Sequence, residues 1–274
     1  MPELPEVETI RRGLERFLPG RRFTRVDVHD RRLRTPLRPA ALRRRLVGRR
    51  VQALKRRAKY LLVELDDGSV LVLHLGMSGR LSCTAAEQPL APHTHVVFRL
   101  DSEKELRFRD HRRFGMLFVV RRERLDRHPR FAHLGPEPLE AGFSPGYLFE
   151  RSRGVRRPVK NFLMDAAVVV GVGNIYASEA LHRAGVHPNA AAARLRLPRW
   201  QRVHAAVRHT LESAVVAGGT TLNDFHSVDG REGEFQVQLD VYGREGEACR
   251  RCGRVIRRLV QSGRSTFYCP GCQR

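Results

Sequence analysis

Apolar residues near the N-terminus recur with a helical period. The spacing of three or four positions predicts an amphipathic helix over residues 3–18. Pro2 stands just before this stretch, and three glutamates lie within the first eight residues, as the start of a helix favours. The chain is therefore expected to open with a helix whose apolar face covers a core. The residues that carry the period are Leu4, Val7, Ile10, Leu14 and Phe17.

Short apolar or alternating runs replace the helical period from about residue 22 to residue 120. Polar turns separate these runs, as expected for β-strands that follow one another closely. Several strands at such close spacing favour a β-sandwich or a barrel, and we predict a sandwich. The clearest predicted strands cover residues 60–65, 70–75, 95–100, 105–109 and 116–120.

A helical pattern returns in the second half of the chain. Residues 135–147 are rich in Gly and Pro, which makes this stretch the best linker candidate. Helices are predicted over 159–168, 174–184 and 198–217, with Asn174 as the N-cap of the second. Gly230 and Gly233 lie in a polar stretch, which predicts a mobile loop around residues 226–235.

These patterns predict an α+β fold in several parts. The first part is a β-sandwich domain with an N-terminal helix (1–135). A linker (136–150) leads to a helical domain (151–240), and a cysteine-rich hairpin (241–274) ends the chain.

Charge narrows the choice of partner. The chain has 51 Lys and Arg against 29 Asp and Glu, a net charge of +22, which points to a polyanion such as nucleic acid. Arginine makes up 47 of the basic residues, which codon bias would favour, but bias does not explain the surplus over acids. A hydrophobic content of 41% argues against disorder, and no apolar run is long enough for a membrane span. The N-terminus does not read as a secretory signal, so a cytoplasmic protein is expected.

Four of the five cysteines lie in the last 26 residues. Their order, Cys249-x2-Cys252-x16-Cys269-x2-Cys272, fits a zinc ribbon in which two tight turns present four thiolates to one ion. Disulfides are the alternative, but paired CxxC turns in a chain without a secretory signal make zinc the better interpretation. Four thiolates would saturate the ion, so it should be structural. Cys83 stands apart and is predicted to be a small buried residue.

Five segments in order give the chain a resemblance to the bacterial formamidopyrimidine-DNA glycosylases. The segments are PELPEVE at 2–8, HLGMSG at 74–79, DHRRFG at 110–115, GVGNIYASE at 171–179 and the four-cysteine ribbon. This family excises oxidised purines from duplex DNA and then nicks the abasic strand by β,δ-elimination. The resemblance implies a β-sandwich joined to a helix–two-turn–helix domain with a zinc hairpin. It also implies a monomer that needs one zinc ion and no other cofactor.

The N-terminus offers a nucleophile. Removal of Met1 would free the secondary amine of Pro2, and an α-amino group has a pKa of about 7.7–8.0, so part of it is neutral at physiological pH. Attack of this amine on a sugar C1′ would give an iminium, the electron sink that elimination needs. Glu3 is the candidate acid that moves protons beside it. Taken alone, Pro2 would more readily be a proline that starts a helix, and Glu3 would suit the positive end of that helix whether or not it also moves protons.

The resemblance assigns further residues to catalysis and to DNA. Lys59 and Arg264 are expected to assist catalysis, Arg264 from near the tip of the zinc hairpin. Asn174 at a helix start would offer backbone N–H groups to a phosphate. Generic basic surface is the alternative for Arg264. The remaining expected DNA contacts are His74, His93, Arg112, Arg156 and Lys160.

An enzyme that extrudes a base must support the gap that the base leaves. By resemblance, Met77, Arg112 and Phe114 fill that gap, with the arginine bonded to the orphaned base; core packing is the alternative for Met77 and Phe114. Two positions depart from the family pattern. His111 stands where proline is usual, and Ala166 where a polar residue is common.

Two other functions stay open from the sequence. The first is a related glycosylase that removes oxidised pyrimidines with the same amine chemistry. The second is a zinc-ribbon protein that binds nucleic acid without catalysis, although such a protein would have no use for a free amine beside an acid.

Overall fold

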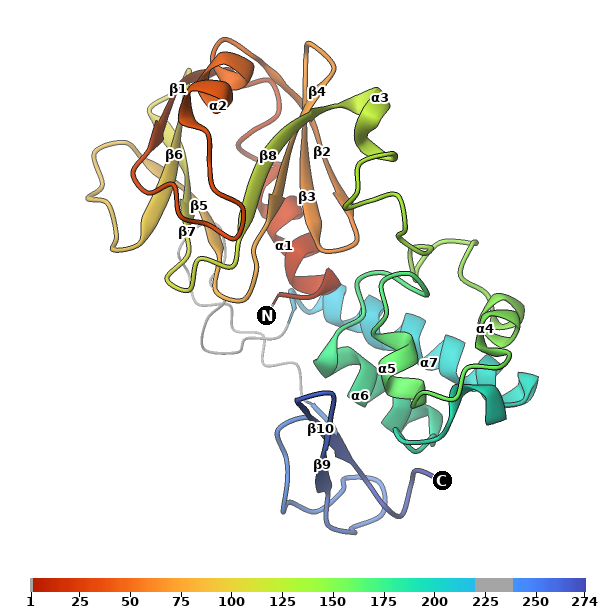
Figure 1. The fold of residues 1–274 in the computed structure, drawn as a ribbon. Coiled ribbons are helices and arrows are strands. Elements are labelled where there is room, and N and C mark those ends of the chain that lie inside the picture. The colour runs from red at the N-terminus through yellow and green to blue at the C-terminus, as the bar shows by residue number, and fades with distance from the viewer. Residues whose placement is uncertain (1, 220–238) are drawn as a thin grey trace. The chain divides into compact units, whose positions relative to one another are not determined.

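A computed structural model describes residues 2–219 and 239–274, which form two compact units (Figure 1). The first unit holds residues 2–132 together with Gly218 and Gly219. The second holds residues 133–217 and 239–274. The predicted loop around 226–235 lies outside the described residues. No helix in the described part is long and apolar enough to cross a membrane.

The first unit is a sandwich of two antiparallel sheets, as predicted. One sheet has the order β1-β6-β7-β5 and the other β2-β3-β4-β8. The strands are β1 (Phe23–Val28), β2 (Val51–Arg57), β3 (Tyr60–Leu65), β4 (Ser69–His74), β5 (Arg80–Ala85), β6 (Thr94–Leu100), β7 (Lys104–Arg109) and β8 (Met116–Arg121). Helices α1 (Leu4–Leu14), α2 (Pro39–Leu46) and α3 (Arg122–Leu125) complete the unit.

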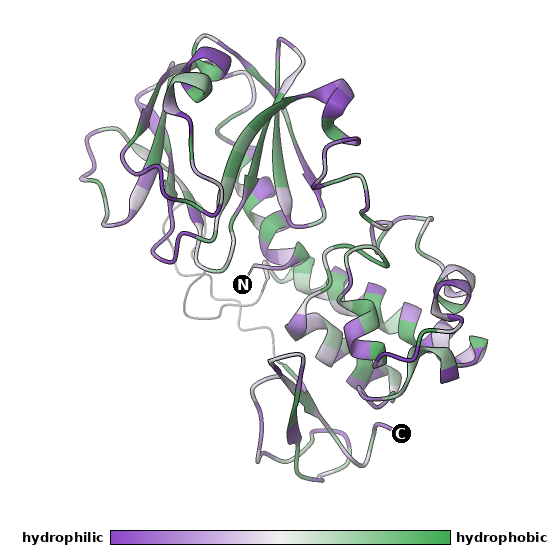
Figure 2. Cartoon of the chain, in the orientation of Figure 1, coloured by the Kyte–Doolittle hydropathy of each residue, from purple (hydrophilic) through white to green (hydrophobic). Residues whose placement is uncertain are grey.

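One apolar core fills the sandwich. It combines side chains of both sheets, such as Phe98 and Phe108 from one and Val63 and Leu71 from the other, all fully buried. The strands are mostly hydrophobic, while the connecting loops are more polar (Figure 2). Cys83 belongs to this core, which confirms the prediction of a buried thiol.

Helix α1 is shorter than predicted. It ends at Leu14 and residues 15–17 form turns, while Pro19 disfavours a helical conformation at Leu18 and so prevents the helix from reaching the predicted end. Leu18 still packs into the core, which explains why the apolar period continued past the end of the helix.

The second unit combines helices with a two-stranded hairpin. Its elements are α4 (Pro145–Ser152), α5 (Val159–Leu163), α6 (Asn174–Ala184), the short helix η1 (Ala192–Arg194), α7 (Leu197–Val216), β9 (Arg257–Gln261) and β10 (Arg264–Tyr268). Trp200 is fully buried in its core, where the indole Nε1 donates to Ser152 Oγ at 3.1 Å. The hairpin shares this compact unit with the helices.

Two boundaries in the second unit differ from those predicted. Residues 136–150 are not a free linker, because Phe143 and Leu148 are buried in the core and Ser144 Oγ caps α4 by accepting from Tyr147 N–H. Helix α5 ends five residues early. Just beyond it, the Asp165 carboxylate accepts from Ala167 N–H at 2.9 Å, a local turn that competes with the helix.

Candidate active site and nucleic-acid interface

The N-terminal residues are held by the start of α1. Glu3 is the N-cap, and its backbone N–H donates to Glu6 Oε2 at 2.7 Å within a capping box. The two glutamates are only 2% and 3% exposed, while Pro2 is half-buried. Gly219 packs against the Glu6 carboxylate, since a Cβ at residue 219 would lie 3.0 Å from Glu6 Oε1. The acid next to Pro2 is therefore fixed in position by the fold.

Helix α1 runs antiparallel to β2, which brings its N-terminus toward the β2–β3 turn. Arg11 donates to the Leu54 carbonyl at 3.4 Å, and one helical turn earlier Glu8 pairs with Arg56 at 3.3 Å. The start of α1 is therefore directed toward the tight turn formed by Ala58 and Lys59. Ala58 has a φ of 53° in this turn. Sequence patterns placed Lys59 just before a strand, and the structure places it at this turn.

His74 lies beside that turn, at the end of β4. It pairs with Tyr60 across the sheet, and the two rings are 4.9 Å apart. Burial, with Lys59 and nearby arginines adding to it, lowers the pKa of His74 to about 4. The neutral ring accepts a hydrogen bond from Gly76 N–H at Nδ1, at 3.0 Å. His74 thus fixes the first residues of the β4–β5 loop.

Asp110 joins the β4–β5 and β7–β8 loops. Its Oδ1 accepts from Ser78 Oγ at 2.5 Å, and its Oδ2 accepts from Gly115 N–H at 2.7 Å. Arg112 N–H donates in turn to Ser78 Oγ at 3.2 Å. Gly76 allows the close approach of the two loops, because it has a φ of +64° and a Cβ there would lie 2.4 Å from the carbonyl carbon of Phe114.

These loops present the three side chains predicted to fill the gap. Met77 is 37% exposed and Phe114 is 42% exposed, so neither is a core residue. The Arg112 guanidinium lies over the Phe114 ring at 4.9 Å. Exposed apolar side chains on loops held by a buried carboxylate suit insertion into a base stack.

His93 and His111 lie next to Asp110, which joins the two loops. His93 is exposed with a φ of 66°, and its carbonyl accepts from Asp110 N–H at 3.1 Å. The His111 ring, at the position that departs from the family pattern, is 6.4 Å from the His93 ring. Ala166 and Arg156, both in the second unit, are exposed.

Lys160 and Asn174 form a buried polar centre in the second unit. Lys160 is 1% exposed, and its Nζ donates to Asn174 Oδ1 at 2.5 Å and to Thr266 Oγ1 at 2.6 Å. Asn174 Nδ2 donates to the Ser265 carbonyl at 2.9 Å. Lys160 thus connects α5 to the start of α6 and to β10.

The prediction of Asn174 as an N-cap was wrong. Gly173 is the N-cap of α6, and Asn174 is the first helical residue. Its side-chain amide bonds to Lys160 and to the hairpin rather than to the helix backbone, so the backbone N–H groups of this turn are left to other partners.

Arg264 is exposed at the start of β10, next to the tight turn of Ser262 and Gly263. It pairs with Gln261 across the hairpin. The turn residues have φ values of 48° and 73°, as a two-residue hairpin turn requires. The prediction that Arg264 lies near the tip of the hairpin is confirmed.

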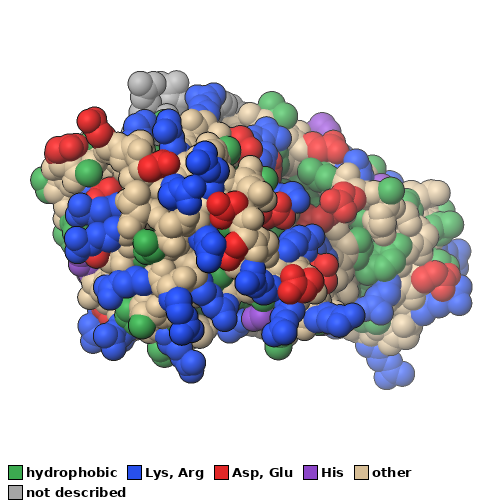
Figure 3. Space-filling view, turned by 90° about the horizontal axis from the view of Figure 1, so that it is seen from above, with side chains coloured by type: hydrophobic (Ala, Val, Ile, Leu, Met, Phe, Trp, Pro, Cys, Tyr) green, Lys and Arg blue, Asp and Glu red, His purple; other side chains and the backbone are tan. Residues whose placement is uncertain are grey.

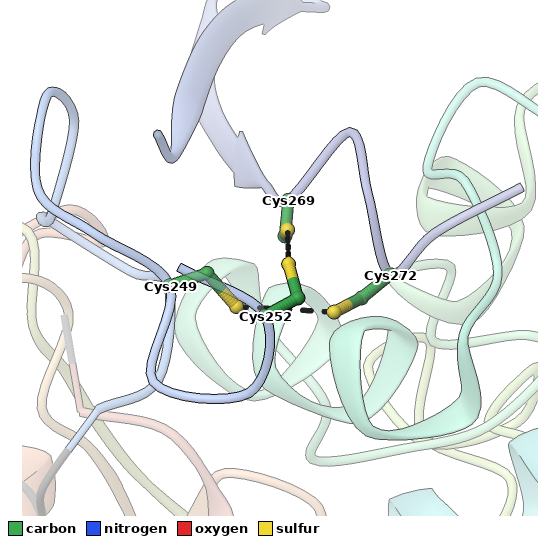
Figure 4. Close-up of side chains that lie close together, drawn as sticks. All are labelled: Cys249, Cys252, Cys269 and Cys272. Carbon is green, nitrogen blue, oxygen red and sulfur yellow. Dashed lines mark hydrogen bonds between the residues drawn. The ribbon is translucent and has the colours of Figure 1, made fainter. Parts of the chain in front are cut away.

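The four C-terminal cysteines converge on one point. Their Sγ atoms all lie within 4.8 Å of one another, and in Figure 4 the sulfur atoms point toward a common centre. A hydrogen bond from the backbone of Arg254 helps to lower the pKa of Cys252 to about 7, whereas burial raises the pKa of Cys269 and of Cys272. Four thiolates in this arrangement fit a tetrahedral structural zinc.

Glu179 anchors the segment that leads to the cysteines. It lies in α6, is 7% exposed and accepts backbone N–H groups from Asp240, Val241 and Tyr242 at 2.8–3.0 Å. Burial raises the pKa of Glu179, and these three hydrogen bonds oppose the rise. Sequence reasoning gave this residue, Ser78 and Asp110 no role, although each lies within one of the five segments singled out.

Positive charge dominates the surface seen in Figure 3. Lys and Arg side chains are scattered over much of that face, with Asp and Glu side chains among them. A duplex binds such surfaces through its phosphates.

A two-sheet sandwich with a buried acid at its N-terminus, joined in one chain to helices and a four-cysteine hairpin, defines a class of zinc-bearing DNA-processing proteins. Three family models match the chain in order. They are the formamidopyrimidine-DNA glycosylase N-terminal domain over residues 1–117, the H2TH domain of these enzymes over 134–226, and the zinc finger found in FPG and IleRS over 246–274.

Curated proteins and solved structures agree with these matches. The chain is 53% identical to the formamidopyrimidine-DNA glycosylase of Aromatoleum aromaticum and 50% identical to that of Thioalkalivibrio sulfidiphilus, each over the full length of both chains. It is also similar to a Lactococcus lactis FPG mutant in complex with Fapy-dG containing DNA, with a TM-score of 0.93, 31% identity and full coverage of both chains. The chain belongs to the formamidopyrimidine-DNA glycosylase family, and its four cysteines hold one structural zinc ion.

Proposed function

We propose that this protein repairs DNA by excising oxidised purines from the duplex and then nicking the abasic strand. The observation that carries the proposal is the start of α1, where a buried glutamate is fixed by a capping box directly after Pro2. Family membership supports it, and the Lactococcus lactis relatives were crystallised with DNA containing Fapy-dG or an abasic site. The protein would act as a monomer on chromosomal DNA in the cytoplasm.

Pro2 is the proposed nucleophile once Met1 has been removed. Its nitrogen attacks C1′ of the damaged nucleotide as the glycosidic bond breaks, and the base leaves with the bonding electrons and takes up a proton. The nitrogen then loses its proton, the C1′–O4′ bond opens with a proton from Glu3 going to O4′, and the nitrogen lone pair forms the C=N bond. The resulting iminium accepts electrons as the strand phosphates are eliminated on the 3′ and then the 5′ side. Glu3 exchanges protons at the sugar, and Lys59, at the turn that α1 approaches, assists from the same unit.

Recognition of the lesion is assigned to the paired loops of the first unit. Met77 and Phe114 would enter the stack where the damaged base has left it, while Arg112 bonds to the orphaned base. The stacking of Arg112 on Phe114 and the buried Asp110 support this role, because both restrict the loops before DNA arrives.

The second unit is assigned to the phosphates. Arg264 is exposed on the hairpin and would clamp the strand beside the lesion and assist the second elimination. The backbone at Asn174 would offer N–H donors at a helix start. Lys160, being buried, would support this site by holding Asn174 and the hairpin together. The other proposed DNA contacts are Arg156 in this unit and His74, His93 and Arg112 in the first unit.

Oxidised pyrimidines are the second candidate substrates. One Lactococcus lactis FPG structure similar to this chain, with a TM-score of 0.91, was solved with DNA containing an oxidised pyrimidine. Incision of matched duplexes carrying 8-oxoguanine or thymine glycol distinguishes the two. Faster incision of 8-oxoguanine supports the proposal, and incision of neither would leave a nucleic-acid-binding protein.

Covalent trapping tests the nucleophile. Borohydride should reduce the iminium and join protein to DNA, and peptide mapping should place the adduct on residue 2. An N-terminal tag that is not removed blocks the amine and should abolish excision and strand cleavage while DNA binding survives. Glu3→Gln should also bind without excising. An adduct on Lys59, or full excision by the blocked protein, would overturn the role of Pro2.

A further inference from the structure

A histidine lies against the zinc ligands without being one of them. His182 is in the last turn of α6 and is 1% exposed. Its Nε2 is 3.6 Å from Cys249 Sγ, within range of a hydrogen bond to sulfur. Cys249 itself is only 2% exposed, so its thiolate has little access to water. A buried anion of this kind needs a donor nearby.

The geometry distinguishes a donor from a fifth ligand. Among the described residues, the ligand atoms that all lie within 4.8 Å of one another are the four Sγ atoms, and His182 Nε2 is not in that group. Four thiolates already complete a tetrahedral zinc site. The imidazole therefore lies outside the coordination sphere and contacts a single ligand.

The other ring nitrogen fixes the tautomer. Nδ1 of His182 is buried and has no hydrogen-bond partner among the described residues. With the proton on Nε2, only a lone pair is unpaired at Nδ1. With the proton on Nδ1, a buried N–H would be unpaired and the Nε2 lone pair would face a thiolate. The first arrangement is the favourable one.

We propose that His182 is a positioning residue of the zinc site, donating its Nε2–H to the Cys249 thiolate. Zn²⁺ with four thiolates carries a net charge of −2, and the hydrogen bond disperses part of that charge on its buried side. Residues around a metal commonly orient its ligands in this way and change metal affinity 10–100-fold when removed.

The contact also couples two functional parts of the second unit. His182 ends the same helix that Asn174 begins, and Arg251, within the cysteine ribbon, donates to the His182 carbonyl at 3.2 Å. Both ends of α6 therefore contact the ribbon. His182, in the last turn of the helix, lies against Cys249, and Asn174, at the start of the helix, donates to the Ser265 carbonyl in β10. Loss of the histidine should loosen the first connection and leave the second.

A spectroscopic test needs no variant. In the full chain with ¹¹³Cd in place of zinc and ¹⁵N-labelled histidine, a small coupling between ¹¹³Cd and the Nε2 proton should be seen across the N–H···S bond. Detection of this coupling supports the proposal. A large one-bond coupling from ¹¹³Cd to nitrogen would make His182 a ligand, and absence of any coupling would remove the hydrogen bond. Either result overturns the proposal.

Variants test the effect on the metal. His182→Phe removes the donor and should weaken zinc binding at least 10-fold in competition with a calibrated chelator. His182→Gln keeps an N–H of similar reach and should stay within about three-fold. His204→Phe is the matched control, since His204 Nε2 bonds to the Phe143 carbonyl at 2.9 Å in the same unit and contacts none of the cysteines. Equal losses in all three variants would mean a purely structural role.

Discussion

Several polar side chains of the candidate site are buried and fully engaged in hydrogen bonds. Glu3 shares a capping box, Lys160 donates to Asn174 and Thr266, and Glu179 accepts three backbone N–H groups. Burying such groups is costly unless every bond is made, so each substitution here removes more than one contact. At this scale the site is a set of residues whose geometry is fixed before DNA binds.

His74 makes stability depend on pH. Its pKa is about 4 in the folded protein against 6.5 for a free histidine. The unfolded chain therefore binds the proton more readily, and stability present above about pH 6.5 is lost as the pH falls toward 4. Below that range the protonated ring also ceases to accept from Gly76 N–H.

Urea unfolding at pH 7.0, 5.5 and 4.5 measures this loss. The wild type should lose up to about 1.4 kcal/mol per pH unit from this residue. His74→Gln should be less stable at pH 7 but should show a shallower fall. His133→Gln is a control, because His133 is exposed. Parallel pH profiles for wild type and His74→Gln would contradict the assignment.

Among the structural elements, the paired loops of the sandwich depend on Asp110. Asp110→Asn replaces one of its two accepting oxygens by an amide NH₂ that meets either Ser78 Oγ or Gly115 N–H. We expect a loss of about 2 kcal/mol in the free energy of unfolding, since a buried donor loses its acceptor. Excision should fall further than DNA binding, because Met77 and Phe114 lose their fixed positions.

Asp101→Asn is the matched control, as Asp101 is exposed between β6 and β7. Urea unfolding, excision of 8-oxoguanine and binding to undamaged duplex should be measured for both variants. An Asp110→Asn protein with wild-type stability and excision would show that the loops are held by other contacts.

The zinc ribbon is an element that folds around its metal. Cys249→Ser removes one thiolate, so the ion should be lost and Arg264 should leave its position on the hairpin. DNA cleavage should collapse while the β-sheet signal in circular dichroism is retained, because the sandwich has its own core. Removal of zinc from the wild type by a chelator should reproduce the effect. Retained cleavage without zinc would separate Arg264 from the reaction.

Local sequence patterns predicted the positions of helices and strands better than they predicted which residues contact one another. All five predicted strand starts lie within one residue of the observed ones, because short apolar runs between polar turns are themselves the signal of a strand. The ends of α1 and α5 were missed, since Pro19 and the Asp165 turn act through backbone conformation rather than hydrophobicity. The four cysteines were found because their spacing is itself the signal.

Contacts between residues far apart in the sequence were not predicted. Ser78 lies 32 positions from Asp110, Asp240 lies 61 from Glu179, and Cys249 lies 67 from His182. No periodicity links such pairs, so only the fold brings them together. The prediction of Asn174 as an N-cap was wrong for the same reason. Its side-chain amide accepts from Lys160 and donates to the Ser265 carbonyl, and both partners lie in other parts of the second unit.

For the whole molecule, charge decides how the protein meets undamaged DNA. The net charge of +22 and the basic surface in Figure 3 favour contact with phosphates wherever the duplex is met. Contacts with about five phosphates would give a slope of log K against log[salt] of roughly −4 to −5. Affinity for an undamaged duplex should then fall by roughly 500-fold between 50 and 200 mM salt.

Fluorescence anisotropy with a labelled undamaged duplex measures this slope. Arg264→Ala should make it shallower by about 0.9, the release expected for one phosphate contact. The amine-blocked protein keeps the same basic surface, so it should keep the full slope even though it cannot excise a base. A wild-type slope shallower than about −2 would mean that the surplus of arginine is not used on phosphates. In that case the affinity for undamaged DNA would have to come from groove contacts, which salt weakens little.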